Sequence, residues 1–355
     1  MIVVTIIVFL LILGLLIFVH ELGHYATARF FGVKVEEFGI GYPPRIYARK
    51  RGETEYSLNW IPLGGFCKLL GEEDPSSPRS LASKKPLVRL VVLGAGSFMN
   101  AVLPIILLTI AFMVPRQVNV EDILIEGIAP DSPAMEAGIE PRDTILSMNG
   151  NAVENRGDVF YYTHLSFGEE TTLELLKPDG TIETVTLIPR WDPPEGEGAM
   201  GINLYPEPVN LRTISESDPF WEAVPKSATT LWQTFELIRN EVKSWFVQKE
   251  APEVGGPVAI FQLTGEANEA GPSYLLQFAA FLSLNLAIIN LFPLPALDGG
   301  RIVFVLIEIV RRGKRVSPRT EAMVHLVGFM MLMGLIVVIT YYDILRAIRG
   351  ESLVP

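Results

Sequence analysis

The sequence predicts a polytopic α-helical membrane protein with four transmembrane helices, a membrane-associated β-hairpin and an inserted extracytoplasmic α+β domain. Three observations support this fold class. Four runs are long and apolar enough to cross a bilayer, at 2–19, 87–114, 274–297 and 323–342. A turn-rich stretch at about 35–72 follows the first run, and an acidic, water-compatible stretch separates the second run from the third.

The first apolar run is expected to be a retained span rather than a cleaved signal peptide. It carries no charge, and as a helix of 18 residues it would be about 27 Å long, close to the thickness of a hydrocarbon core. No Lys or Arg precedes Arg29, and no small-residue cleavage site follows the run, so two marks of a signal peptide are missing.

The distribution of charge predicts the orientation in the membrane. Residues 45–89 contain nine Lys and Arg and residues 311–319 contain five, whereas residues 115–272 carry 27 Asp and Glu against 10 Lys and Arg. The positive-inside bias places both basic loops in the cytoplasm and the acidic segment outside. We therefore expect a multi-pass protein of the inner (plasma) membrane, and the acidic balance argues against a nucleic-acid partner.

The stretch between the first two spans predicts a hairpin. Its glycines and prolines exclude a helix, and "RIYARK" and "EYSLNWIPL" read as strands around the turn "RGET". The stretch is apolar for a loop, so it fits a hairpin that dips into the membrane interface; an ordinary cytoplasmic hairpin fits as well. Cys67, the one cysteine, reads as a small packing residue and excludes an intrachain disulfide.

Residues 117–192 predict a separate small domain between the membrane halves at 1–116 and 273–355. "SPAMEAGI", "RDTILSMNG" and a hairpin around Pro178-Asp179-Gly180 resemble a PDZ domain of the kind attached to bacterial proteases. One departure is Arg142, where that pattern usually has Gly. The resemblance implies capture of an extended peptide or of a trimmed substrate end.

Residues 193–272 are expected to hold a linker followed by an amphipathic helix. Trp191–Ser217 is rich in Pro, Gly and acid, and residues 219–247 carry Trp and Phe at helical spacing. Such a helix fits the outer membrane interface, with lipid as its partner, and it fits equally well a position packed on the PDZ-like domain.

The motif "HELGH" at 20–24 predicts a metal site. Its histidines, His20 and His24, lie four residues apart, so a helix places both imidazoles on one face, where each can offer a nitrogen to one Zn²⁺. Glu21 projects beside them and can take a proton from water whose pKa zinc has lowered. Ionisable groups at the end of a membrane span need partners, which favours the metal interpretation over a chance match.

The third ligand is expected to be Asp298, in "NLAIINLFPLPALDGGR". By the charge argument this aspartate ends the third span on the cytoplasmic side, level with the histidines of the first span. Pro293 and Pro295 break the helix just before it. Glu36 and Glu37 are nearer in sequence but flank the turn-rich stretch, and we read His164 and His325 as ordinary surface or packing histidines.

"HELGH", "GSFMN" and "NLFPLPALDGG" together resemble the site-2 proteases, the zinc intramembrane proteases, over nearly the whole chain. The intervening PDZ-like unit is similar to their bacterial sigma-factor-regulating branch. The resemblance implies that His20, His24 and Asp298 bind zinc, that Glu21 is the catalytic base and that Asn290 contacts the substrate. It also implies that Gly96 and Asn100 pack near the active site and that the hairpin is a membrane re-entrant element.

The resulting hypothesis is hydrolysis of a peptide bond within a substrate's transmembrane segment, near the cytoplasmic side. Single-span proteins such as anti-sigma factors, or signal-peptide remnants, are the expected substrates after a first protease has trimmed them. An edge strand at 56–62 would hold the unwound substrate, and Asn59, Trp60, Ile61 and Pro293 are expected to contact it.

Two rival functions share part of the pattern. A membrane-anchored zinc protease acting on soluble segments would draw its third ligand from a nearby glutamate, so Asp298→Asn would spare zinc binding. A PDZ scaffold without catalysis would tolerate the loss of Glu21.

Overall fold

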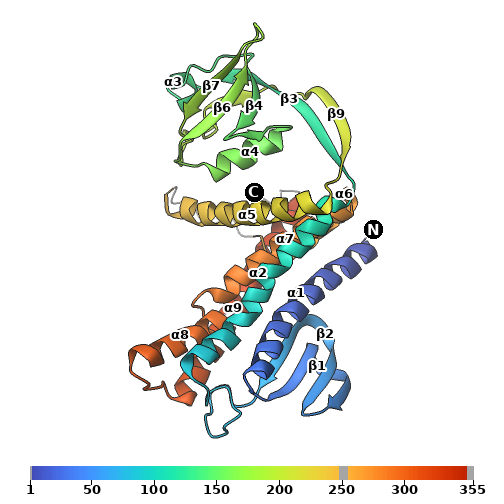
Figure 1. The fold of residues 1–355 in the computed structure, drawn as a ribbon, viewed down its shortest axis with the longest axis vertical. Coiled ribbons are helices and arrows are strands. Elements are labelled where there is room, and N and C mark those ends of the chain that lie inside the picture. The colour runs from blue at the N-terminus through green and yellow to red at the C-terminus, as the bar shows by residue number, and fades with distance from the viewer. Residues whose placement is uncertain (1, 248–254, 350–355) are drawn as a thin grey trace. The chain divides into compact units, whose positions relative to one another are not determined.

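The fold is described by a computed structural model, which covers residues 2–247 and 255–349. The chain divides into two compact units (Figure 1). The membrane unit comprises Met1–Phe112 and Glu253–Pro355, and the sheet unit comprises Met113–Pro252. Each unit is built around its own buried residues, so the inserted segment forms a compact unit of its own.

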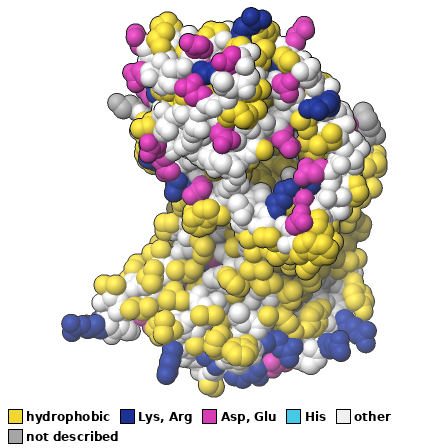
Figure 2. All heavy atoms as spheres, turned by 45° about the horizontal axis from the view of Figure 1, so that its top comes forward, with side chains coloured by type: hydrophobic (Ala, Val, Ile, Leu, Met, Phe, Trp, Pro, Cys, Tyr) yellow, Lys and Arg dark blue, Asp and Glu magenta, His cyan; other side chains and the backbone are white. Residues whose placement is uncertain are grey.

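Among the residues that the structure describes, four helices of the membrane unit are long and apolar enough to cross a bilayer, in agreement with the predicted number of spans. They are α1 (Ile2–Phe30), α2 (Pro86–Met113), α7 (Pro272–Leu291) and α9 (Pro318–Arg349). Large hydrophobic side chains stay exposed along these helices, as lipid-facing helices require. Figure 2 shows hydrophobic side chains over much of this unit, with Lys and Arg gathered at its lower end.

The third span is shorter than its apolar run. Helix α7 ends at Leu291, and residues 292–297 are not helical. Pro293 and Pro295 break the helix as predicted, because proline lacks the N–H that continues a helix. Asp298 therefore does not end the third span; it begins a further helix, α8 (Asp298–Val310), which the sequence reading missed. Helix α6 (Pro257–Ala270), which follows the amphipathic helix expected at 219–247, was missed as well.

The hairpin predicted at about 35–72 is present, and its strands β1 (Val35–Arg51) and β2 (Thr54–Leu69) are longer than the two segments read as strands. Its strands fold back on themselves, so that residues 37–40 register with two stretches of β2. The register of 37–40 with 55–58 is parallel, whereas the register of 37–40 with 65–68 is antiparallel. Residues 56–58 also pair with 47–49, so they have a neighbour on each side and form no edge.

The sheet unit is built on a seven-stranded sheet. Its main order is β7-β6-β4-β3-β8, with β5 on β4 and β9 on β3. The strands are β3 (Arg116–Ile128), β4 (Thr144–Met148), β5 (Asn151–Ala152), β6 (Thr171–Leu176), β7 (Ile182–Leu187), β8 (Ile202–Leu204) and β9 (Val209–Glu216). Two short helices accompany them, α3 (Pro133–Glu136) and α4 (Arg156–Leu165). The core consists of apolar side chains that alternate along these strands, such as Ile123, Ile125, Leu173 and Leu175.

Local turn chemistry in this unit follows the sequence. Asn149 and Gly150 both have positive φ, at 49° and 77°, as a tight turn between antiparallel strands requires. The hairpin around Asp179 is confirmed as β6 and β7. Arg142 adopts φ 78°, a conformation that favours glycine, so the turn keeps its shape although the residue departs from the PDZ pattern. The identity of the unit as a PDZ domain stays a prediction.

The predicted linker at 191–217 is wrong for much of its length. It contains β8 and β9, and both pair with β3. Short strands in a stretch rich in Pro and Gly have no local signature, because their partner β3 lies about 75–100 residues earlier in the chain.

Helix α5 (Phe220–Val247) lies against α4 within the sheet unit (Figure 1). The Asn240 amide donates to the carbonyl oxygens of His164 (2.9 Å) and Leu165 (3.1 Å), which confirms packing on the inserted domain. Trp221 and Phe246 remain 74% and 79% exposed, so an aromatic face is left open. The contact of that face with lipid stays a prediction.

Candidate metal centre

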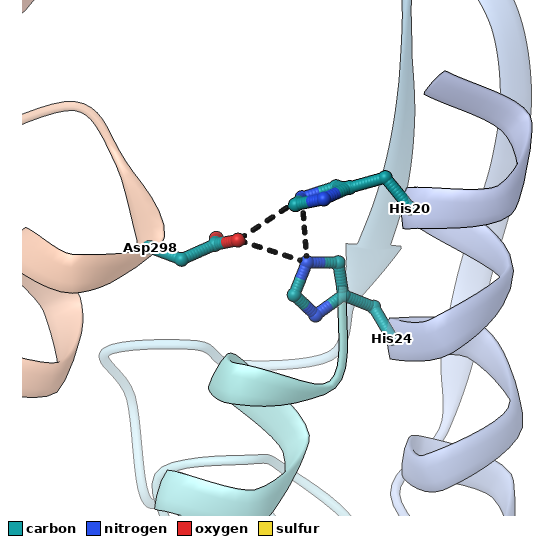
Figure 3. Close-up of side chains that lie close together, drawn as sticks. All are labelled: His20, His24 and Asp298. Atoms are coloured by element: carbon teal, nitrogen blue, oxygen red, sulfur yellow. Dashed lines mark hydrogen bonds and ion pairs between the residues drawn. The ribbon is translucent and has the colours of Figure 1, made fainter. Parts of the chain in front are cut away.

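The side chains of His20, His24 and Asp298 converge on one point (Figure 3). Helix α1 places the two imidazoles one turn apart, with their Nε2 atoms 3.2 Å from each other. Asp298 Oδ2 lies 3.0 Å from His20 Nε2 and 3.1 Å from His24 Nε2. Two residues of the first helix and one 274 positions further along the chain thus face each other, as the sequence predicts.

The arrangement fits a zinc ion. Ligands at 2.0–2.1 Å from a tetrahedral zinc lie roughly 3.3–3.4 Å apart, close to the three separations found here. Two imidazole nitrogens and one carboxylate oxygen are a donor set that zinc accepts, and a catalytic site needs three protein ligands with one position left open. Both histidines are 8% exposed, and the Asp298 side chain is 14% exposed, so the three ligands are largely buried.

A backbone carbonyl fixes the ring of His24. Its Nδ1 lies 2.8 Å from the carbonyl oxygen of Val92 in α2, which can only accept a hydrogen bond. The proton of the neutral ring therefore lies on Nδ1, and the lone pair of Nε2 faces the space between the three side chains, where a metal ion would bind. This is the tautomer that a metal ligand needs.

Asn100 of α2 plays the same part for His20. Its side-chain amide lies 3.5 Å from His20 Nδ1, with the amide nitrogen toward the ring, while the amide oxygen is buried without a hydrogen-bond partner among the described residues. Turning the amide over brings the oxygen to His20 Nδ1–H, since the two orientations have nearly the same shape. That orientation leaves Nε2 of His20 free for the metal.

Gly96 gives the imidazoles their space. A Cβ at this position of α2 would lie 2.4 Å from His24 Nε2 and 2.6 Å from His20 Nε2, well inside contact distance. Any side chain larger than hydrogen would push the rings away. The predicted role of Gly96 and Asn100 next to the site therefore has a physical reason in each case.

Asp298 is held by a compact loop. Residues 292–297 turn back over the start of α8, where a Cβ on Gly299 would lie 2.1 Å from the carbonyl oxygen of Phe292. A Cβ on Gly300 would lie 2.4 Å from the carbonyl oxygen of Leu294. The two glycines after Asp298 thus let the loop close tightly and turn the carboxylate toward α1.

Glu21 stands beside the ligands and next to the hairpin. The backbone of Cys67 in β2 lies near its carboxylate. A Cβ on Gly65 would lie 2.8 Å from Ile17 Cγ2 and 3.4 Å from Glu21 Cγ, so the strand passes close to α1 here. The carboxylate can therefore reach water at the site while staying outside the ligand cluster.

The structure separates the residues predicted to contact substrate. Asn59 is 5% exposed and donates to the carbonyl oxygen of Gly41 at 3.1 Å, so its side chain is occupied within the hairpin. The predicted edge strand at 56–62 is wrong for residues 56–58, which are paired on both sides, whereas Asn59 and Ile61 each pair with one residue of β1. Trp60 and Ile61 are exposed, Pro293 is exposed in the loop before Asp298, and Asn290 is half-buried in the last turn of α7.

The remaining candidates for a third ligand are engaged elsewhere. Glu37 pairs with Arg45 at 2.8 Å, and Glu36 pairs with Lys68 at 3.1 Å. The His164 ring lies against the backbone oxygen of Phe160 in the sheet unit. His20, His24 and Asp298 are the one group of metal-binding side chains found within residues 2–247 and 255–349.

One residue was missed. The sequence reading treated His325 as an ordinary packing histidine, but its Nδ1 accepts a hydrogen bond from the backbone N–H of Ala296, at 3.0 Å, two residues before Asp298. No local pattern gives such a contact, because the two residues lie 29 positions apart on different elements.

Comparison with known proteins gives one family. The model of peptidase family M50 matches residues 8–335. A protein of Clostridium perfringens, named as a candidate zinc metalloprotease, is 40% identical over 339 residues, which cover 95% of this chain and 97% of the relative. A protein of Clostridium acetobutylicum with the same designation is 35% identical over 346 residues, covering 97% and 98%. One from Nostoc is 32% identical over 338 residues, covering 91% of each.

Proposed function

Because this chain belongs to peptidase family M50, a family of zinc metalloproteases, we propose that it is an intramembrane zinc endopeptidase of the site-2 type. Zinc is its cofactor, as in the family. The observation that carries the proposal is the meeting of His20, His24 and Asp298 in a unit with four membrane-spanning helices. The cluster lies among helices that cross the membrane, so its substrate is proposed to be a membrane segment.

His20, His24 and Asp298 are the proposed zinc ligands. Zinc, when bound, supplies a Lewis acid that polarises a peptide carbonyl and lowers the pKa of water. Glu21 is the proposed general base: its carboxylate takes a proton from the attacking water and passes it to the leaving nitrogen. The C–N bond breaks as the water oxygen bonds to the carbonyl carbon, and the products are a carboxylate and an amine.

The hairpin and the loop before Asp298 flank this chemistry. Residues 65–67 of the hairpin lie beside Glu21, so we place the unwound substrate next to them instead of next to 56–62. Asn290, Trp60, Ile61 and Pro293 remain proposed contacts. A helical substrate must unwind first, because a helix hides its peptide bonds in internal hydrogen bonds.

The sheet unit is the proposed filter for substrates. Its PDZ-like part at 117–192 and helix α5 would lie outside the cell membrane and turn away proteins with bulky outer domains. Single-span proteins, such as anti-sigma factors or signal-peptide remnants, would enter after a first cut had removed those domains. The support is the charge distribution, which places this acidic segment on the outer side.

The test uses purified protein in detergent with a single-span substrate that lacks a large outer domain. The wild type is compared with Glu21→Gln and Asp298→Asn, and zinc is measured in every sample. We expect cleavage by the wild type alone, full zinc in Glu21→Gln and little zinc in Asp298→Asn. Cleavage by Glu21→Gln would remove that residue as the base, and full zinc in Asp298→Asn would favour a soluble-substrate protease with another third ligand.

A further inference from the structure

We infer that His325 is a positioning residue that holds the zinc-binding carboxylate of Asp298 in place. The inference rests on the proposed function, because it assumes that Asp298 binds the metal. Helix α9 carries His325, and it touches both the loop before Asp298 and the helix that Asp298 begins. His325 is not a member of the cluster of His20, His24 and Asp298, so the proposed zinc coordination does not explain its position.

The first contact is the hydrogen bond to the loop. Ala296 donates its backbone N–H to His325 Nδ1 at 3.0 Å, and the contact is partly buried. Ala296 has φ 78°, which an L-residue with a side chain rarely adopts. A conformation of that kind persists only where its surroundings enforce it, and this hydrogen bond is one of the enforcing contacts.

The second contact is packing. The ring of His325 lies 5.5 Å from the ring of Phe304 on α8, centroid to centroid. One turn further along α9, a Cβ on Gly328 would lie 2.1 Å from the Cβ of Pro295. The backbone of α9 at Gly328 therefore packs directly against Pro295 of the loop. His325 contacts both the loop before Asp298 and helix α8, which begins at Asp298.

Hydrogen bonds within the loop connect Ala296, which His325 holds, to Asp298. Leu297 donates its N–H to the carbonyl oxygen of Leu294 at 3.2 Å, and the N–H of Gly300 returns to the carbonyl oxygen of Leu297 at 3.1 Å. Only Leu297 stands between the residue that His325 holds and Asp298. A loop released at Ala296 would let the Asp298 carboxylate move away from the two imidazoles.

The hydrogen bond also assigns the state of the ring. Nδ1 must present its lone pair to the Ala296 N–H, so the proton of the neutral imidazole lies on Nε2. Nε2 is buried and has no hydrogen-bond partner among the described residues. The contact that matters is thus an acceptor at Nδ1, which the Oδ1 atom of an asparagine can reproduce and a leucine cannot.

The experiment measures zinc affinity by competition with a chelator and records the visible spectrum of the cobalt-loaded protein. His325→Leu removes the acceptor, His325→Gln moves it outward and His325→Asn keeps it near Nδ1. Leu326→Ala is the matched control, because Leu326 is the next residue on α9 and is 62% exposed. Loss of a contact that orients a metal ligand lowers metal affinity by roughly 10–100-fold.

We expect that fall in affinity, with an altered cobalt spectrum, for the Leu and Gln variants, and affinity within about threefold of wild type for Asn. If His325→Leu does not fold, the comparison of Gln with Asn decides alone. Equal affinity of wild type and the Leu and Gln variants would overturn the inference, as would an Asn variant as weak as the Leu variant.

Asp298→Asn, measured in parallel, separates the two proposals. Loss of zinc in Asp298→Asn with wild-type affinity in His325→Leu removes the positioning role and leaves the proposed function intact. Wild-type affinity in Asp298→Asn removes the ligand itself, and both proposals fall.

Discussion

The backbone of Gly96 lies so close to His24 that a methyl group on it would come within 2.4 Å of the Nε2 atom. Both imidazoles therefore pack against the backbone of α2 at Gly96, and the position of this helix determines the direction of their Nε2 lone pairs. The predictions below follow from contacts of this kind around the cluster.

Gly96→Ala is expected to lower zinc affinity by roughly 10–100-fold, because the added methyl displaces both imidazoles. Zinc content after dialysis against a chelator measures the effect. Gly94→Ala is the matched control, since a Cβ there meets no atom within 4 Å. An unchanged zinc content in Gly96→Ala would show that the rings can shift without losing the metal.

Asn100→Leu is expected to weaken zinc binding by a similar factor of roughly 10–100, because His20 Nδ1 loses the group that fixes its tautomer. Asn100→Asp keeps an oxygen at that place and should bind zinc more tightly than the Leu variant. Ser97→Ala serves as control: the Ser97 hydroxyl is buried without a partner among the described residues, so its removal breaks no hydrogen bond.

Gly65→Ala should separate catalysis from metal binding. The new methyl would press on Ile17 and approach Glu21, while the three proposed ligands stay untouched. We expect kcat to fall on the order of 10²-fold with zinc content unchanged, since a displacement of about 1 Å has that effect on a catalytic group. Leu58→Ala, on an exposed position of the same strand, should keep wild-type kcat. Zinc loss in Gly65→Ala would contradict the prediction.

Glu308 should make stability depend on pH at the acid end. Burial alone would raise the pKa of this carboxyl, but hydrogen bonds from Arg89 and Arg315 hold it below its ordinary value. Its stabilising effect is therefore complete above the unfolded value of about 4.3 and is lost as the pH falls through the lower folded pKa.

Glu308→Gln is accordingly expected to lower the free energy of unfolding by roughly 3–5 kcal/mol at pH 7, because Arg89 is left buried and unpaired. Thermal unfolding in detergent at a series of pH values gives the measurement, and the gap between wild type and variant should start to narrow as the pH falls below about 4.3 and close once it is below the lower folded pKa. Glu53→Gln removes an exposed ion pair with Arg79 and should leave the unfolding midpoint unchanged.

The parts of the fold that sequence predicted are those with a local signature. The spans follow from uninterrupted apolar runs, and the His20–His24 spacing follows from helical periodicity. Asp298 was assigned to the same membrane depth as His20 and His24 from the distribution of charged residues between the spans, which is a property of the whole chain.

The missed parts depend on distant partners. Strands β8 and β9 are defined by pairing with β3, and the double pairing of 37–40 makes 56–58 a central stretch although it alternates like an edge. Helix α8 was missed because the break before it, at residues 292–297, lies within the apolar run read as the third span. The role of His325 comes from a contact between two elements, which no spacing within either one shows.

The distance of 274 residues between the ligands has a consequence for biosynthesis. The ribosome delivers both histidines with the first helix, but the carboxylate follows only when most of the chain has been made, and His325 later still. A nascent chain therefore carries only two of the three proposed ligands until the segment with Asp298 has been made. If these three residues bind zinc as proposed, proteolytic activity is expected only after the C-terminal helices have been synthesised, so the order of the chain would delay activity during translation.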